Sequence, residues 1–158
     1  MKKFKSGIIP QNIKALVGDI GEKHVLLRLA LLAHQNKGWQ VFQNVNKSGF
    51  DIALINSRKK IIAIEVKTRQ KLFSTGKKQN NINFGLSDLE YRTSDFLIAY
   101  YLDGNIFLVI KKTKLKRTAD GKWGIRLTLR KDGQPHPSFK QYINAWHLLS
   151  PDFKETHQ

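Results

Sequence analysis

Cysteine is absent from the chain, and its absence excludes two ways of holding a fold together. Disulfide bridges and thiolate metal sites cannot form, so the fold has to rest on a hydrophobic core, which 158 residues are enough to build. A chain without disulfides fits a reducing compartment, and we expect a cytoplasmic protein. Apolar runs near the roughly 18 residues that a membrane span needs are also missing.

Acidic residues are also scarce in the chain. The chain has 12 Asp and Glu residues against 28 Lys and Arg residues, which gives a formal net charge of +16 at pH 7. Such an excess predicts a polyanionic partner, because each neutralised phosphate releases counterions from nucleic acid. An anionic membrane is the alternative partner, but no basic amphipathic helix stands apart from the rest of the chain. Nucleic acid is therefore the favoured partner, and no membrane association is expected.

Hydrophobic periodicity and turn residues predict the order of the elements. Apolar residues spaced three and four apart indicate helices, and alternating or continuous short apolar runs indicate strands. The expected elements are a helix at 19–34, strands at 39–45, 50–55, 61–67 and 81–85, a helix at 88–92, a hairpin of 95–102 with 105–112, a second hairpin of 113–117 with 123–130, and a helix at 138–149.

The strand at 61–67 has a continuous apolar run, which predicts burial on both faces and a central position in its sheet. The whole pattern predicts a single domain of the α/β or α+β class, with a central mixed β-sheet flanked by helices. Residues 1–17 are expected to form a basic N-terminal arm and residues 18–112 the core. Residues 113–158 are expected to form a C-terminal extension made of a hairpin and a helix.

Charged residues end the strand predicted at 61–67. Alternation places Glu65 and Lys67 on one face, and Asp51 opens the preceding strand. A short turn joins the two strands antiparallel, so Asp51 falls close to Glu65. Taken singly, Asp51 is typical of a turn residue, and Glu65 with Lys67 is typical of an ion pair at a strand end. Together they predict a site, and two carboxylates suit Mg²⁺ or Mn²⁺ better than zinc.

This constellation resembles the PD-(D/E)xK nuclease superfamily. The match is Asp51 at the head of one strand and the stretch "EVK" at 65–67 in the next; Phe50 stands where the proline of the name would be. The stretch "GDIGEKHVLLRLAL" at 18–31 is similar to the first helix of archaeal Holliday-junction resolvases and of intron-encoded homing endonucleases. The hairpin at 94–110 resembles the one that follows the motif in the same group.

The resemblance implies a restriction-endonuclease-like fold and a single nuclease domain spanning the chain. It implies that Asp51 and Glu65 bind a divalent metal, Mg²⁺ or Mn²⁺, assisted by the backbone carbonyl of Val66. Lys67 would activate water or stabilise the pentavalent phosphate, and a Gly-x-x-Gly-Glu stretch would bring Glu22 to the same metal-binding active site. Such a metal neutralises the phosphate and generates a hydroxide near neutral pH.

Glu22 has a second interpretation. The stretch from Asp19 to Glu22 fits a capping box, in which Glu22 only bonds back to the amide of Asp19. Yet Glu22 also lies four and seven residues before Leu26 and Leu29, in the apolar stripe that is expected to face the core. A side chain needed only as a cap would face water more comfortably, so its place in the stripe favours the active site.

Basic side chains follow the predicted site. The segment 68–81 carries Arg69, Lys71, Lys77 and Lys78 and is expected to form a loop. A solvated loop is one interpretation of these charges. A loop that contacts the phosphates of a nucleic acid beside a phosphodiester site is better supported, given the net charge of the chain.

The leading hypothesis is a Mg²⁺-dependent DNA endonuclease that hydrolyses phosphodiester bonds. Its substrate is either branched DNA, as for a junction resolvase, or a specific duplex site, as in homing or restriction; RNA is less favoured by the resemblance. Small nucleases that cut both strands usually need two active sites, so we expect a homodimer or a higher symmetric oligomer. The alternative is a non-catalytic nucleic-acid-binding module, against which the presence of Asp51, Glu65 and Lys67 together argues.

Overall fold

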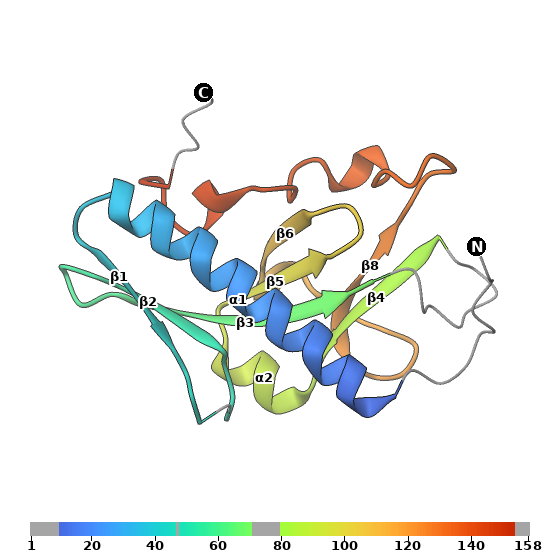
Figure 1. Cartoon of the computed structure of the whole chain (residues 1–158), viewed down its shortest axis with the longest axis horizontal. Helices are drawn as coiled ribbons and strands as arrows, with labels where there is room; N and C mark the ends of the chain where they lie inside the picture. Colours follow the sequence, from blue (N-terminus) through green and yellow to red (C-terminus); the bar gives the residue numbers. More distant parts are fainter. Residues whose placement is uncertain (1–9, 47, 71–79, 154–158) are drawn as a thin grey trace.

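A five-stranded mixed sheet with strand order β1-β2-β3-β5-β6 forms the centre of the molecule (Figure 1). The computed structural model describes residues 10–46, 48–70 and 80–153. The helices and strands are α1 (Gln11–Gln35), β1 (Trp39–Gln43), β2 (Ile52–Asn56), β3 (Ile61–Arg69), β4 (Asn81–Leu86), α2 (Asp88–Thr93), β5 (Phe96–Tyr101), β6 (Ile106–Lys111), β7 (Lys116–Arg117) and β8 (Trp123–Thr128), with 3-10 turns η1 (Lys112–Lys114), η2 (Pro137–Phe139) and η3 (Trp146–Leu148).

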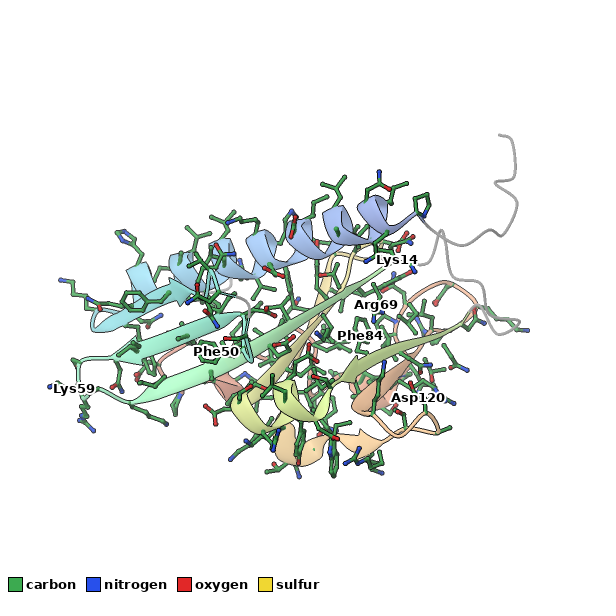
Figure 2. All side chains as sticks on the ribbon, turned by 90° about the horizontal axis from the view of Figure 1, so that it is seen from below. Lys14, Phe50, Lys59, Arg69, Phe84 and Asp120 are labelled. Carbon is green, nitrogen blue, oxygen red and sulfur yellow. The ribbon has the colours of Figure 1, made fainter. Side chains whose placement is uncertain are left out.

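Two hydrophobic clusters lie on opposite faces of the central sheet. On one face, Val25 and Leu29 of α1 pack with Ile62 and Ile64 of β3. The other face is covered by a second, three-stranded sheet of order β4-β8-β7, whose buried residues join those of β5 and β6 in the second cluster. Figure 2 shows α1 on one side of β3 and β4 with α2 on the other. Within the described residues, no helix is both long and apolar enough to cross a membrane.

β3 is the central strand of the five, as its continuous apolar run predicts. It pairs antiparallel with β2, where Ile52 lies opposite Ile64, and parallel with β5, where Glu65 lies opposite Leu97. Residues 62–66 are all buried, because α1 covers one face of the strand, and β4 and α2 lie on its other side (Figure 2). The predicted fold class, a mixed sheet flanked by helices, is confirmed.

The first helix begins earlier than predicted. α1 starts at Gln11, directly after Pro10, so the part of the predicted basic arm from 11 to 17 is helical; residues 1–9 lie outside the described part of the chain. Proline discourages helix before it but fits the start of one, since its missing N–H needs no partner there. The carbonyl of Pro10 accepts the N–H groups of Ile13 and Lys14 at 3.0 and 3.1 Å.

The helix predicted at 138–149 is wrong. This segment forms the two short 3-10 turns η2 and η3, with further turn residues and one isolated β-bridge residue, Ile143, between them. The carbonyl of Tyr142 accepts the N–H of Val109 on β6 at 2.9 Å, so the segment meets β6 in a single antiparallel bridge between Ile143 and Leu108. Asn144 then has a positive φ of 49°, a left-handed conformation that ends any helix. Tertiary pairing has overridden the helical periodicity.

Several local predictions are confirmed. β4 forms close to the expected range, Ser87 caps α2 with its side chain, and β5 and β6 pair across the turn at Asp103 and Gly104. The hairpin of β7 and β8 is also present. The sequence did not reveal that β8 pairs with β4 as well, over 81–86, which joins two predicted elements into one sheet.

Candidate active site

A pocket of about 270 Å³ opens where β2 begins and β3 nears its end. Its walls come from α1, the turn before β2, β3, and the start of α2. The lining residues are Glu22, Ser48, Gly49, Asp51, Glu65, Val66, Lys67, Ser87, Leu89 and Glu90. The structure therefore brings together in one pocket every residue predicted for catalysis or metal binding. Their chemical roles stay predictions.

Asp51 directly precedes β2 and extends its ladder by one residue. Its backbone N–H donates to the carbonyl of Ile64 at 2.9 Å, and its carbonyl accepts the N–H of Asn44 at 2.7 Å. Its side chain turns onto β3, where Oδ2 accepts the backbone N–H of Val66 at 2.8 Å. These bonds hold the Asp51 carboxylate beside Glu65, at the place that hairpin geometry predicts.

Glu65 is a carboxylate buried inside the sheet, with 3% of the residue exposed. Its Oε1 accepts a hydrogen bond from Nζ of Lys67 at 2.6 Å. Its other oxygen, Oε2, is also buried and has no hydrogen-bond partner among the described residues. Because a buried polar oxygen without a partner costs about 1–3 kcal/mol, and more when the group is ionised, this oxygen works against stability. A ligand bound at Oε2 would offset that penalty.

Glu90 is the site residue that sequence reasoning missed. It lies on α2, where it completes a capping box: its Oε2 accepts the N–H of Ser87 at 2.7 Å, and Ser87 Oγ accepts its N–H at 3.3 Å. Its other oxygen, Oε1, accepts a bond from Lys67 Nζ at 2.8 Å. The pattern Ser-x-x-Glu at 87–90 signals the cap, but nothing local in the sequence signals the second bond.

The electrostatics of the pocket favour a neutral Glu65 and a charged Lys67. Burial raises the pKa of Glu65 to about 8, with Lys67 opposing the rise and Asp51 adding to it. Burial likewise raises the pKa of Asp51, against a backbone hydrogen bond and the Lys67 charge. Burial acts to lower the pKa of Lys67, but Glu65 and Glu90 outweigh it and raise that pKa. Lys67 is therefore an ammonium throughout the neutral range.

Glu22 reaches the pocket because α1 lies unusually close to β3. A Cβ at Gly21 would fall 1.6 Å from Oγ1 of Thr68, so only glycine permits this approach. The next residue, Glu22, is half-buried and lines the pocket. The capping-box interpretation of Glu22 is wrong, because α1 starts at Gln11 and Asp19 lies well inside the helix.

The basic residues predicted to contact nucleic acid are placed only in part. Arg69 is the last residue of β3 and is exposed; its Nη1 donates to the carbonyl of Thr68 at 2.9 Å. The predicted loop therefore starts later than 68, because β3 continues its pairing with β5 as far as Arg69. Lys71, Lys77 and Lys78 lie outside the described residues.

The donors of the pocket fit a hard divalent cation. Asp51 and Glu65 supply carboxylate oxygens, and Glu65 Oε2 is buried without a partner among the described residues. Oxygen donors of this kind suit Mg²⁺ or Mn²⁺. Within the described part of the chain, no three His, Cys, Asp or Glu side chains cluster closely enough to form a metal site by themselves. A cation here would therefore need a backbone carbonyl, such as that of Val66, and water to complete its ligands.

A larger pocket of about 890 Å³ lies elsewhere, beside η3. Its lining residues include Lys111, Lys114, Lys140, Trp146 and His147 but no carboxylate. Without an acidic group it offers no carboxylate ligand for a hard cation, and it lacks the interacting charges found around Glu65. The smaller pocket is thus the better candidate for catalysis, despite its size.

No protein-family model and no curated protein sequence matches the chain. Among solved structures, the chain is similar to a bacterial homing endonuclease, I-Ssp6803I, with a TM-score of 0.64 and 18% identity over 92% of this chain and 95% of that chain. It also matches Hjc, a Holliday junction resolvase of Archaeoglobus fulgidus, with a TM-score of 0.49 and 19% identity over 68% of this chain and 82% of that chain. The first likeness confirms the predicted nuclease-type fold; at this identity it shows the fold alone.

Proposed function

We propose that the chain is a metal-dependent DNA endonuclease whose active site is the pocket around Asp51, Glu65 and Lys67. The observation that carries this proposal is the buried carboxylate of Glu65, which has one oxygen on Lys67 and the other without a partner among the described residues. Stability alone gives no reason to keep such a group, whereas a cation and a phosphate arriving at the pocket would use it.

Asp51 and Glu65 would hold a Mg²⁺ or Mn²⁺ ion together with the Val66 carbonyl. Bound there, the ion would neutralise charge on a phosphate and lower the pKa of a water molecule. The protein contributes rigidity: the Asp51 carboxylate is fixed by the Val66 N–H, and Glu65 by its place in the central strand. The carboxylates of Asp51 and Glu65 are therefore positioned before a substrate binds.

Lys67 would stabilise the negative charge that builds up on the phosphate. Glu65 and Glu90 hold its ammonium from two sides and raise its pKa, so it is a donor of hydrogen bonds and not a base. Glu22, at the α1 side of the pocket, would accept a proton or a hydrogen bond from the attacking water. Water activation thus falls to the carboxylates, and charge stabilisation to Lys67.

DNA is the proposed substrate, because the net charge of +16 suits a polyanion and the protein of similar fold is described as a homing endonuclease. Of the two substrate classes predicted from the sequence, this fold likeness supports a specific duplex site over a junction. Arg69, at the exposed end of β3, would contact the DNA backbone, as would Lys71, Lys77 and Lys78 of the segment that follows.

Self-association is part of the proposal, since cutting two strands usually needs two sites. Leu27 and Leu31, one turn apart on α1, are 61% and 49% exposed and offer an apolar surface for a second copy. Light scattering coupled to gel filtration measures the mass directly. A dimer or higher oligomer is expected, and a monomer at micromolar concentration would contradict it.

A cleavage assay tests the proposed activity. The full chain is incubated with a four-way junction, a duplex of random sequence and a supercoiled plasmid, each with Mg²⁺ and with EDTA. We expect Mg²⁺-dependent cleavage; discrete plasmid fragments would identify a specific duplex site, and cutting confined to the junction a resolvase. Binding of DNA without cleavage under any divalent cation would favour the non-catalytic binding module instead.

A further inference from the structure

The outer face of the second sheet carries a set of polar side chains that the proposed catalysis does not use. Inward-facing residues of β4 and β8, such as Phe84 and Leu127, are buried in the second cluster. The alternate positions point away from the core. They are Asn81, Asn83 and Gly85 on β4, Arg126 and Thr128 on β8, and Lys116 on β7, which pairs with the buried Gly124 of β8. We call this set the outer face.

Side chains of the outer face are held in cross-strand pairs. Arg126 Nε donates to Asn83 Oδ1 at 3.0 Å, and both residues are exposed. One position further along the same face, Thr128 Oγ1 donates to Asn81 Oδ1 at 3.1 Å. The bond to Asn83 uses one edge of the Arg126 guanidinium, and among the described residues its terminal nitrogens have no partner. A rigid, outward donor fork results.

The charge of the outer face is of one sign. None of its positions on the three strands is acidic, while Arg126 and Lys116 are cationic. The aliphatic part of the Lys122 side chain lies against Gly85, since a Cβ added at Gly85 would come within 3.3 Å of it. Lys122 is therefore a third cation on the outer face, at the end nearest the pocket. The acidic residue of the β7–β8 turn, Asp120, sits at the tip of that turn, beyond the strands (Figure 2).

Continuity with the proposed active site sets the outer face apart from an ordinary solvated sheet. β4 ends at Leu86, and the next residue, Ser87, lines the catalytic pocket. Asn83 lies four residues before Ser87, which is about 13 Å along an extended strand at about 3.3 Å per residue. Duplex DNA whose phosphate enters the pocket would therefore pass the outer face about four base pairs away, at about 3.4 Å per base pair.

We propose that the outer face enters the major groove of duplex DNA and reads bases through Arg126 and Asn83. This inference rests on the proposed function for its substrate. Arginine pairs with guanine, and asparagine with adenine, through two hydrogen bonds each, and the major groove, about 12 Å wide, admits a two-stranded ribbon. Lys116 and Lys122 at the margins would contact the phosphates on either side of the groove.

The test selects bound sequences from a library of duplex DNA with a randomised centre, in EDTA so that nothing is cut. The full-length parent is compared with Arg126→Lys, which keeps the charge but loses the two-pronged donor, and with Asn83→Ala. Arg130→Ala is the matched control, because Arg130 is an exposed arginine that pairs with Asp132 in the turn after β8. Circular dichroism confirms that each variant is folded.

The parent should enrich a sequence. Arg126→Lys should keep its affinity for unselected duplex within about twofold and lose roughly tenfold or more of its preference at one base pair. Asn83→Ala should lose its preference at a neighbouring base pair. Arg130→Ala should keep the affinity of the parent and its preference at both base pairs. Three results would each overturn the inference: no sequence enriched by the parent, preferences unchanged in both variants, or equal binding of double-stranded RNA, whose narrow major groove excludes a ribbon. Because the readout is binding, a failure of cleavage is recognised separately.

Discussion

Replacing Glu65 by glutamine should abolish cleavage and yet stabilise the metal-free protein at alkaline pH. The carboxylate is buried, one of its oxygens has no partner among the described residues, and burial raises its pKa to about 8 from an ordinary value of 4.5. Glutamine has nearly the same shape and stays neutral. It therefore removes the penalty of ionising a buried group without leaving a cavity.

The direction of the pH effect follows from proton binding. Because the folded protein holds the Glu65 proton more tightly than the unfolded chain, unfolding releases a proton between pH 4.5 and about 8. The contribution of this group to stability is complete below pH 4.5 and is lost as the pH rises towards 8. At about 1.4 kcal/mol per pH unit the loss reaches about 5 kcal/mol, an upper limit because water entering the pocket relieves part of it.

Urea unfolding of the parent and of Glu65→Gln, in EDTA at about pH 5.5 and about pH 8, measures this difference. The parent should lose several kcal/mol of unfolding free energy relative to the variant over that interval. At about pH 8, Mg²⁺ or Mn²⁺ should raise the stability of the parent and leave the variant unchanged. Parallel pH curves for the two proteins would show that Glu65 is not the strained group that the structure indicates.

Other predictions concern the neighbours of this group. Glu22→Gln should slow cleavage by at least roughly tenfold, about 1.4 kcal/mol in the barrier, with Tm nearly unchanged; cleavage at the parent's rate would remove Glu22 from the site. Glu90→Gln keeps an oxygen for the α2 cap but loses the charge facing Lys67, so kcat should fall while DNA affinity is kept, and an equal fall of both would contradict the role assigned here. Gly21→Ala forces α1 away from Thr68 and should lower the unfolding free energy by about 1–3 kcal/mol in urea titrations. DNA binding should weaken by orders of magnitude between about 50 and about 200 mM salt if about six phosphates are contacted, and a flat response would point to an acidic protein partner.

The centre of the site could be predicted because it is local in sequence. A short turn and strict alternation fix the register of β2 and β3, so Asp51 had to fall opposite Glu65, and Lys67 had to share the face of Glu65. Burying charged residues at the end of an apolar strand costs free energy, and this cost indicates that the charges have a function. The hairpin alone therefore predicts that Asp51, Glu65 and Lys67 lie close together.

Glu90 could not be predicted in the same way. Its bond to Lys67 joins α2 to β3 across 23 residues, and it depends on how β4 leads into α2. The close approach of α1 to β3 is likewise tertiary, since it rests on the absence of a side chain at Gly21 facing Thr68. Sequence reasoning found Glu22 through the resemblance to nucleases, and its alternative role as a cap failed because the helix extends further towards Pro10.

The C-terminal third shows where periodicity misleads. The apolar spacing at 138–149 is helical, but the hydrogen bond between Tyr142 and Val109 and the left-handed Asn144 serve the edge of β6 instead. β4 and β8 pair within the second sheet although α2, β5 and β6 separate them in the chain, and neither strand alone carries a signal of this pairing. Long-range pairing of this kind is decided by packing, which a single sequence does not display.

The most direct test of the proposed active site measures cleavage and DNA affinity side by side for the parent and for Asp51→Asn, with Mg²⁺, on whichever DNA the parent cuts best. Asparagine keeps an oxygen to accept the Val66 N–H, so the fold should hold. We expect the variant to lose cleavage and to bind DNA as well as the parent or more tightly, because a negative charge facing phosphate has been removed. Cleavage by Asp51→Asn at the parent's rate would contradict the assignment of this pocket as the catalytic site.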